Sequence, residues 1–356
     1  MAKGLTPYEN LPPQGFWRTG VAESGVFGLS ELWRSKWELP SDAAFATYGS
    51  CFAQHISRAL RARGIAWVEG EPAPMATRAE IARHFNYGVF SARTANIYTV
   101  AQLELLFRMA LGEVPVEAPE VWPHEGRFRD SLRPLIEPGG FATLTEALAS
   151  RRAMLRGFKA SIVRADVFVF TLGLTEGWES PQGLPYAACP GTLGGSFDAG
   201  QHRFVNYKTQ EVADGLRRSL ALMRRINPQI RLLLTVSPVP LTATASGQHV
   251  LLATTWSKSV LRAAAGELCA EEGNVDYFPS FEIITGAMTR SAFFDPNLRT
   301  VAGAGVDQVM KHFFAGLRLT APARGDSPPP DHSAINQAEA AEALACEEVM
   351  LERFNA

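Results

Sequence analysis

The sequence lacks most of the features that assign a protein to a class at first sight. Its four cysteines are scattered through 356 residues without a CxxC pair, which is atypical of a zinc site and of a disulfide framework. No run approaches the roughly 18 apolar residues that a membrane span needs. The first residues hold no apolar segment of a signal peptide. We therefore expect a cytoplasmic globular protein with no membrane span and no metal site.

A charge of one sign is also missing. The chain has 34 Lys and Arg against 36 Asp and Glu, a formal net charge of -2, with both signs mixed along it. Proteins that bind nucleic acid usually carry a basic patch or stripe, so no nucleic-acid partner is expected. What the chain does have is apolar residues, 46% of the total, and these suffice for one large buried core.

Short apolar runs alternate with helical patterns along the chain. A strand followed repeatedly by a helix predicts an open, mainly parallel sheet that is covered on both faces. The expected fold class is therefore α/β, a three-layer α/β/α sandwich. Residues 113–141 are expected to form a loop, and 180–206 an insertion or short hairpin. Strands are expected at 44–48, 64–70, 165–173, 230–240 and 275–284, and helices at 52–63, 100–112, 143–163, 208–226, 250–272 and 303–317.

Composition divides the chain into four parts. Residues 1–40 are rich in Pro, Gly and Trp without a steady period, and they predict an irregular N-terminal arm. The α/β domain follows at 41–320. The Pro-rich run at 321–332 predicts a linker, because no compact element tolerates that density of proline. Residues 333–356 predict a helical tail, which is a candidate for contact with a protein partner.

The first predicted strand ends in three small residues, Gly49, Ser50 and Cys51. Ligands of open α/β sheets bind beyond the carboxyl ends of the strands, and Gly49 permits a tight turn there. A thiol at the start of the next helix has its anion favoured, so its pKa falls from about 8.5 toward 7. A hydroxyl would need a separate base. Structural roles are equally open for both residues. Ser50 can be a helix N-cap, and Cys51 can be a small buried residue.

Polar residues gather at other predicted strand ends as well. Glu176 is a candidate to orient a histidine or bind substrate, or else a first-turn helix carboxylate. Arg93 is a candidate to hold an anionic group, or else part of a surface salt bridge. The strand at 165–173 leads into Gly173, Thr175 and Glu176, and the loop at 86–98 supplies Gly88, Ser91, Arg93 and Asn96.

The block "YGSCFAQHI" resembles the signature of the GSCFA family, a group within the SGNH/GDSL hydrolase superfamily. The blocks "FNYGVFSARTANIYT", "TLGLTEGW", "TVSPVPLTATASGQHV" and "YFPSFEIITG" extend the resemblance, in order, over most of residues 5–317. It implies an SGNH-like fold and acyl chemistry on an ester or thioester, by hydrolysis or by transfer to a carbohydrate or other small acceptor. No cofactor is expected, with acyl-CoA an option as co-substrate.

The resemblance also implies roles for residues. The superfamily places its nucleophilic serine third in a Gly-Asp-Ser block, so Cys51 is the first choice of nucleophile and Ser50 the second. Gly88 is the nearest match to the glycine whose N–H binds the oxyanion. Thr175 stands where the superfamily has an oxyanion-binding asparagine, and one lost donor costs on the order of 10²-fold in rate. The full set of candidate oxyanion or substrate-binding residues is Gly49, Gly88, Asn96, Gly173, Thr175, Glu176 and Arg93.

The general base of the superfamily, an Asp-x-x-His before the last helix, is not visible. Its place holds Asp295 and Arg299, and an arginine stays protonated at ordinary pH. The first choice of base is His249, beyond the strand at 230–240. The second is His55, which follows Cys51 by one helical turn, and His84 ranks no higher than His55. A thiol needs less help from a base than a hydroxyl does.

The missing triad histidine keeps a second hypothesis open. The fold can persist without catalysis, which would leave a binding or assembly protein that contacts its partner through the C-terminal tail. An open cleft with an imidazole about 3–4 Å from the thiol supports the enzyme. An edge closed by apolar side chains supports the binding protein.

Overall fold

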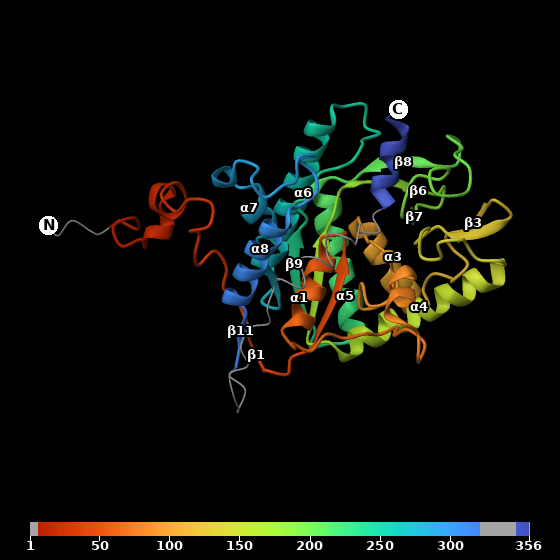
Figure 1. Cartoon of the computed structure of the whole chain (residues 1–356), viewed down its shortest axis with the longest axis horizontal. Coiled ribbons are helices and arrows are strands. Elements are labelled where there is room, and N and C mark those ends of the chain that lie inside the picture. The colour runs from red at the N-terminus through yellow and green to blue at the C-terminus, as the bar shows by residue number, and fades with distance from the viewer. Residues whose placement is uncertain (1–5, 321–346, 356) are drawn as a thin grey trace.

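A computed structural model of the chain describes residues 6–320 and 347–355. Its centre is a parallel four-stranded sheet with the strand order β10-β9-β5-β2 (Figure 1). The sheet confirms the expected α/β class. The linker predicted at 321–332, and the tail at 333–356 up to residue 346, lie outside the described residues. The four strands are β2 (Phe45–Gly49), β5 (Val167–Leu172), β9 (Arg231–Val236) and β10 (Val275–Tyr277).

Helices cover both faces of this sheet, which makes three layers. Successive side chains of a strand point to opposite faces, and along β5 Phe168 and Phe170 enter one core cluster while Val167 and Val169 enter the other. Figure 1 shows α7 and α8 on one side of the sheet and α3 and α4 on the other. The first cluster packs on α3 (Val100–Ala110), α4 (Leu144–Arg164), α5 (Thr209–Ile226) and α6 (Val250–Glu271), and the second on α1 (Ala53–Ala62), α7 (Ser280–Thr285) and α8 (Gly303–Gly316).

The strand expected at 64–70 is reduced to a single bridge. Trp67 pairs with Phe45 in parallel, and the two backbone hydrogen bonds that Phe45 exchanges with Ala66 and Val68 are each 2.8 Å long. The indole of Trp67 also donates to the Thr47 hydroxyl at 2.8 Å. The segment thus occupies the edge beside β2 without extending into a strand.

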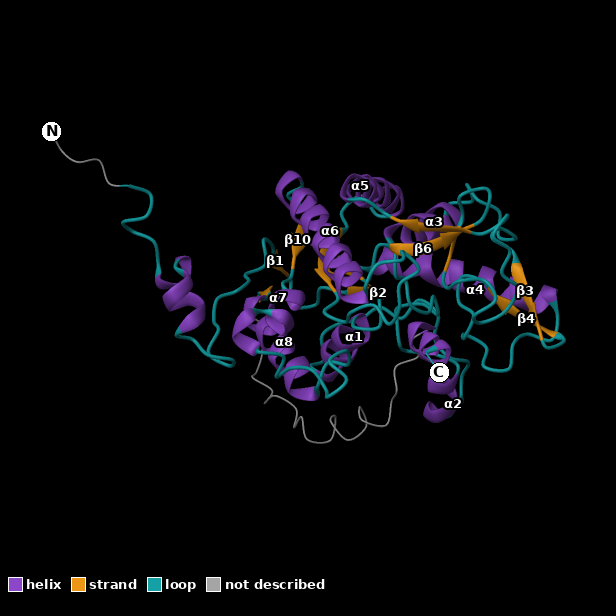
Figure 2. Ribbon diagram, turned by 90° about the horizontal axis from the view of Figure 1, so that it is seen from above, coloured by secondary structure: helices purple, strands orange, loops and turns teal. Residues whose placement is uncertain are grey.

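The segment expected to be a loop and the one expected to be an insertion or short hairpin both contain antiparallel strands. The loop predicted at 113–141 holds a hairpin, and the segment at 176–206 forms a separate three-stranded sheet of order β7-β6-β8, of which Figure 2 labels β6. The hairpin turns at Glu125 and Gly126, both with positive φ. The strands are β3 (Val121–His124), β4 (Arg127–Asp130), β6 (Glu176–Glu179), β7 (Pro185–Tyr186) and β8 (Arg203–Asn206).

The two ends of the domain meet beside the sheet. β1 (Glu38–Leu39) pairs in parallel with β11 (Arg318–Leu319). Before it come the short turns η1 (Pro13–Gly15) and η2 (Arg18–Ala22), which project away from the body in Figure 1. In the part of the chain that the structure describes, no helix is long and apolar enough to cross a membrane. The remaining elements are α2 (Ala79–His84), η3 (Ala287–Thr289) and η4 (Glu347–Phe354).

Candidate active site

The turn after β2 depends on Gly49. Its φ is +128°, and a Cβ there would overlap the backbone of Thr171 in β5. The next N–H, from Ser50, donates to the Thr171 carbonyl at 3.0 Å, and the Ser50 carbonyl accepts from Ala53 at 2.9 Å. Only glycine fits such a close approach at positive φ. The turn therefore fixes Ser50 and Cys51 at the carboxyl edge of the sheet, just before α1.

The Ser50 hydroxyl is buried and makes no hydrogen bond to the described residues. It does not cap α1, whose N-cap is Phe52 and has no side-chain cap. Its Cβ lies 3.1 Å from the position that a Cβ on Gly173 would take, so the residues after β2 and β5 are in contact here. A buried hydroxyl without a partner is costly, and it is placed where the site was expected.

Cys51 lies where the segments after several strands meet. It is 5% exposed, and it forms an apolar cluster with Tyr98, Leu174, Leu241 and Ala253. These residues come from the loop before α3, the segment after β5, the loop after β9 and the first turn of α6. The convergence of segments is the one expected, but the cluster closes the edge around the thiol.

The expected oxyanion donors after β5 already donate within the protein. The N–H groups of Gly173 and Leu174 both bind the Tyr98 carbonyl, at 3.2 and 3.0 Å. Thr175 is fully buried. Its N–H donates to the Ser257 hydroxyl at 2.9 Å and its own hydroxyl to the Asn206 side chain at 2.7 Å. These donors reach a substrate only by exchanging partners.

Asn96 and Gly88, both from the segment at 86–98, lie at different places. Asn96 is buried, and the next N–H, of Ile97, donates to the Gly49 carbonyl at 2.9 Å, so Asn96 is close to the turn. Gly88 has Arg61 as its nearest neighbour. Arg61 belongs to the last turn of α1, whereas Cys51 precedes the first, so Gly88 is away from the thiol.

The Arg93 guanidinium is engaged by the protein itself. It donates to the Phe85 carbonyl at 2.8 Å, to the Tyr87 hydroxyl at 3.3 Å and to the Ile136 carbonyl at 3.1 Å. It also lies 3.8 Å from the Glu71 carboxylate. These contacts hold the loop before α3 in place and leave Arg93 buried, away from a substrate anion.

The two histidines expected as bases differ sharply in environment. His249 is exposed and is the N-cap of α6, where its Nδ1 accepts from the Leu251 N–H at 3.1 Å. The next residue, Val250, packs against the Cys51 cluster. In α1, burial lowers the pKa of His55 to about 3, with a smaller contribution from Arg58. His55 is therefore neutral at ordinary pH, but a base so weak has little driving force for proton transfer.

A cavity of about 260 Å³ adjoins the Cys51 cluster. Tyr98, Leu174 and Leu241 line this cavity and belong to the same apolar cluster as Cys51, which does not itself line it. Glu176 lines it too and is 8% exposed. Burial raises the pKa of Glu176, while hydrogen bonds from the Thr244 side chain and the Ala245 backbone oppose the rise.

Two residues of α6 at this edge were not predicted from the sequence. Lys258 is 3% exposed, and its Nζ donates to the Gly173 carbonyl at 2.5 Å. Ser257 is fully buried and accepts the Thr175 N–H. A signal was present, since Lys258 precedes the buried Leu261 and Ala265 by three and seven residues, which is the spacing of one helix face. In residues 6–320 and 347–355, no group of three or more His, Cys, Asp or Glu is arranged to hold a metal ion.

The structure thus defines a three-layer α/β protein with a glycine turn and an apolar cavity at the carboxyl edge of its sheet. Residues 44–313 match the GSCFA family, and the chain belongs to that family, as its motifs predicted. An acetyl esterase variant crystallised with an acetate ion aligns with a TM-score of 0.29 and 10% sequence identity, over 76% of this chain and 93% of that one. No curated protein matches.

Proposed function

We propose that the protein carries out acyl chemistry on an ester or thioester at the Ser50–Cys51 turn, by hydrolysis or by transfer to a small acceptor such as a carbohydrate. One observation carries the proposal: Cys51 lies at the carboxyl edge of the sheet, in an apolar cluster that shares three residues with the lining of a cavity of about 260 Å³. Ligands of open α/β sheets bind at this edge. No bound cofactor is needed, and acyl-CoA would enter as a co-substrate.

The proposed reaction has two steps. The Cys51 thiolate attacks the carbonyl carbon, and the alcohol or thiol leaves with a proton, so that an acyl-enzyme forms. Water or an acceptor hydroxyl then attacks this acyl group, and the thiol is restored. The start of α1 favours the thiolate, because helix N-termini favour negative charge. Ser50 is the second choice of nucleophile, since its buried hydroxyl has no hydrogen-bonded base in the described residues.

His249 is the proposed base. Its Nδ1 accepts from the Leu251 N–H, so the neutral ring carries its hydrogen on Nε2. Nδ1 is therefore the nitrogen that takes the proton once the ring leaves the cap and turns inward. His55 is second, because of its low pKa.

Substrate entry displaces the Tyr98 and Leu174 side chains in this proposal. A shift of the Tyr98 backbone is also required, because it releases the Gly173 N–H from the Tyr98 carbonyl. Gly173 and Thr175, with Gly49 and Asn96 beside them, then hold the oxyanion. Catalytic hydrogen bonds often form only in the complex.

The test is turnover of p-nitrophenyl acetate, butyrate and octanoate and of acyl-CoA by full-length protein. We expect Cys51→Ala to lower the rate by at least about 100-fold, with an acyl adduct on Cys51 visible by mass spectrometry in the wild type. Cys269→Ala, on the far half of α6, is the matched control and keeps the wild-type rate. Loss in Ser50→Ala alone would transfer the role to Ser50. Equal activity in all variants would overturn the site.

A second function is favoured by one specific observation, the closed state of the edge. The donors after β5 are satisfied internally and the thiol is packed among apolar groups. These are properties of a binding or assembly protein that keeps the fold without the chemistry. It predicts no turnover of any acyl substrate, and alkylation of Cys51 by iodoacetamide more slowly than that of a small free thiol.

A further inference from the structure

The cavity beside the Cys51 cluster is large and mostly apolar. It lies between α3, the β7-β6-β8 sheet and the loop after β9. Its volume of about 260 Å³ far exceeds the roughly 10–15 Å³ that holds one water. The larger apolar side chains in its wall include Leu174, Trp178, Phe204, Leu241 and Leu351.

Most polar groups in the cavity wall are already paired. The Gln102 amide oxygen accepts the N–H groups of Tyr98 and Thr99, at 2.8 and 2.9 Å, and its nitrogen donates to the Tyr186 carbonyl at 2.8 Å. The Tyr186 hydroxyl donates to Glu120 at 2.7 Å. These groups build the wall and leave nothing for a ligand to satisfy.

Glu176 is the exception. Its Oε1 accepts the Thr244 hydroxyl at 2.7 Å, and that hydroxyl in turn accepts from Ser246 at 2.7 Å. No cation contributes to its electrostatic surroundings in the described chain; burial and two hydrogen bonds act on its pKa. An ionised carboxyl group has about four acceptor positions, so a 92% buried group with this few donors keeps acceptor capacity toward the cavity.

We propose that this cavity binds an apolar molecule with one hydrogen-bond-donating head, a primary alcohol or amine, whose head donates to Glu176. The body packs on Leu174, Trp178 and Phe204. A carboxylate in apolar surroundings excludes an anionic head and pairs strongly with a donor, above all a charged one. The proposal rests on the proposed function in one respect: the bound alcohol or amine is the non-acyl half of the substrate, or the acceptor.

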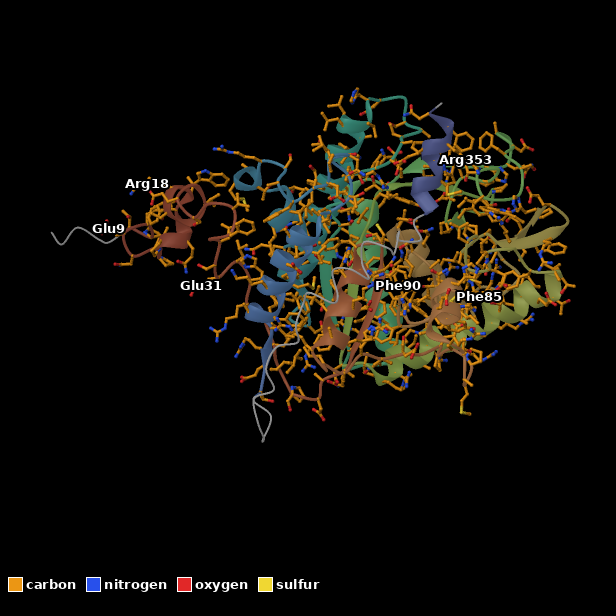
Figure 3. All side chains as sticks on the ribbon, in the orientation of Figure 1. Glu9, Arg18, Glu31, Phe85, Phe90 and Arg353 are labelled. Atoms are coloured by element: carbon orange, nitrogen blue, oxygen red, sulfur yellow. The ribbon has the colours of Figure 1, made fainter. Side chains whose placement is uncertain are left out.

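The C-terminal turn η4 covers part of this cavity. Leu351 lines it, and the Arg353 guanidinium donates to the Thr192 carbonyl. Figure 3 labels Arg353 on this turn. A longer body must displace Leu351, so this turn sets the length of ligand that fits.

The charge test uses isothermal titration of full-length protein with 1-octanol, octylamine and octanoate at pH 7. We expect octanol and octylamine to bind and octanoate not to. In Glu176→Gln, octylamine binding falls by about tenfold or more, octanol binding changes by less than about threefold, and octanoate binding appears. Glu117→Gln, a surface carboxylate paired with Arg152, is the control and keeps the wild-type pattern.

The space test blocks the cavity at its mouth. Ala243 lines the cavity but is exposed, so Ala243→Trp fills space without disturbing the core, and it abolishes octanol binding. Ala270→Trp, exposed near the other end of α6, leaves it intact.

The outcomes separate this inference from the proposed function. Octanol binding that depends on Glu176 without any ester turnover supports the inference and counts against the enzyme. If the protein turns over esters and binds octanoate as tightly as octanol, the cavity holds the acyl half of the substrate and the inference is overturned. It is also overturned if Glu176→Gln changes the affinity for all three ligands by the same factor.

Discussion

At the scale of single residues, Gly49 shows how backbone space fixes the candidate site. Replacing it with alanine adds a Cβ at φ +128° against Thr171. We expect Gly49→Ala to lower the free energy of unfolding by about 2 kcal/mol or more, measured by urea denaturation. Gly139→Ala is the matched control, since nothing lies within 4 Å of its added Cβ. An equal effect of the two changes would contradict the overlap.

Asp130 provides a second residue-scale prediction. It is fully buried between Arg133 and Arg151, at 2.8 and 2.5 Å. Asp130→Asn removes the counter-charge from two buried guanidinium groups, which costs about 3–5 kcal/mol of unfolding free energy. Glu117→Gln, in an exposed pair with Arg152, is expected to cost less than about 1 kcal/mol. Chemical denaturation of both variants measures the difference.

The Asp130 carboxyl group is also expected to make the stability of the fold sensitive to acid. The neighbouring guanidinium groups, against the opposing effect of burial, lower the pKa of Asp130 from 3.8 to about 2. The unfolded chain therefore binds more protons between these values, and stability falls as the pH decreases from about 4 to about 2. Asp130→Asn should show a shallower decline in that window, measured by denaturation at stepped pH. A decline as steep as that of the wild type would assign the effect to other groups.

The roles of single residues could be predicted from the sequence only where the local pattern was sufficient. The Gly49 turn could be predicted because a glycine ends an apolar run and small residues follow it. The pairing of Asp130 with Arg151 could not, because the two are 21 residues apart and nothing local requires it. The sequence does indicate Lys258, as a charged residue on an apolar helix face. Its partner, the Gly173 carbonyl, could not be predicted, because only the tertiary structure brings the two together.

At the scale of elements, substitutions of His249 at the start of α6 can distinguish a structural role of this residue from a chemical one. The imidazole caps the helix, and asparagine is among the best N-caps. We expect His249→Asn to keep the unfolding free energy and His249→Ala to lose about 1 kcal/mol. If His249 is also the base, both variants lose about 10²–10⁴ in the rate of ester cleavage. Full activity in His249→Asn would remove it from the mechanism.

The elements themselves were largely readable from periodicity. Long helices such as α4 and α5 and the buried strands β5 and β9 lie within about one to four residues of their expected bounds. The hairpin of β3 and β4 was missed because its turn places Glu125 at positive φ, where Asn or Gly would have signalled it. The sheet of β6, β7 and β8 was predicted only as an insertion or short hairpin at 180–206, because its strands are only two to four residues long.

At the scale of the whole molecule, the N-terminal arm packs on the domain from Val26 onward, and Phe27 lies against Phe293. Trp33 packs against the same core cluster. Its indole ring centre lies 5.1 Å from that of Phe278 and 5.8 Å from that of Phe313. We expect Trp33→Ala to cost about 3 kcal/mol and to speed tryptic cleavage of the arm. Trp17→Ala, 70% exposed at the outer end of the arm, should leave both the thermal midpoint and the digestion rate unchanged.

The pairing of β1 with β11 brings the two ends of the domain together, with Leu39 beside Leu319. A gene could therefore be rearranged so that a short peptide joins these ends and new termini open elsewhere in an exposed turn. Such rearrangements succeed where the altered backbone is exposed and makes few hydrogen bonds. The exposed turn at Gly247 and Gln248 offers such a place, so the order of segments along the polypeptide can be changed while the central sheet keeps its register.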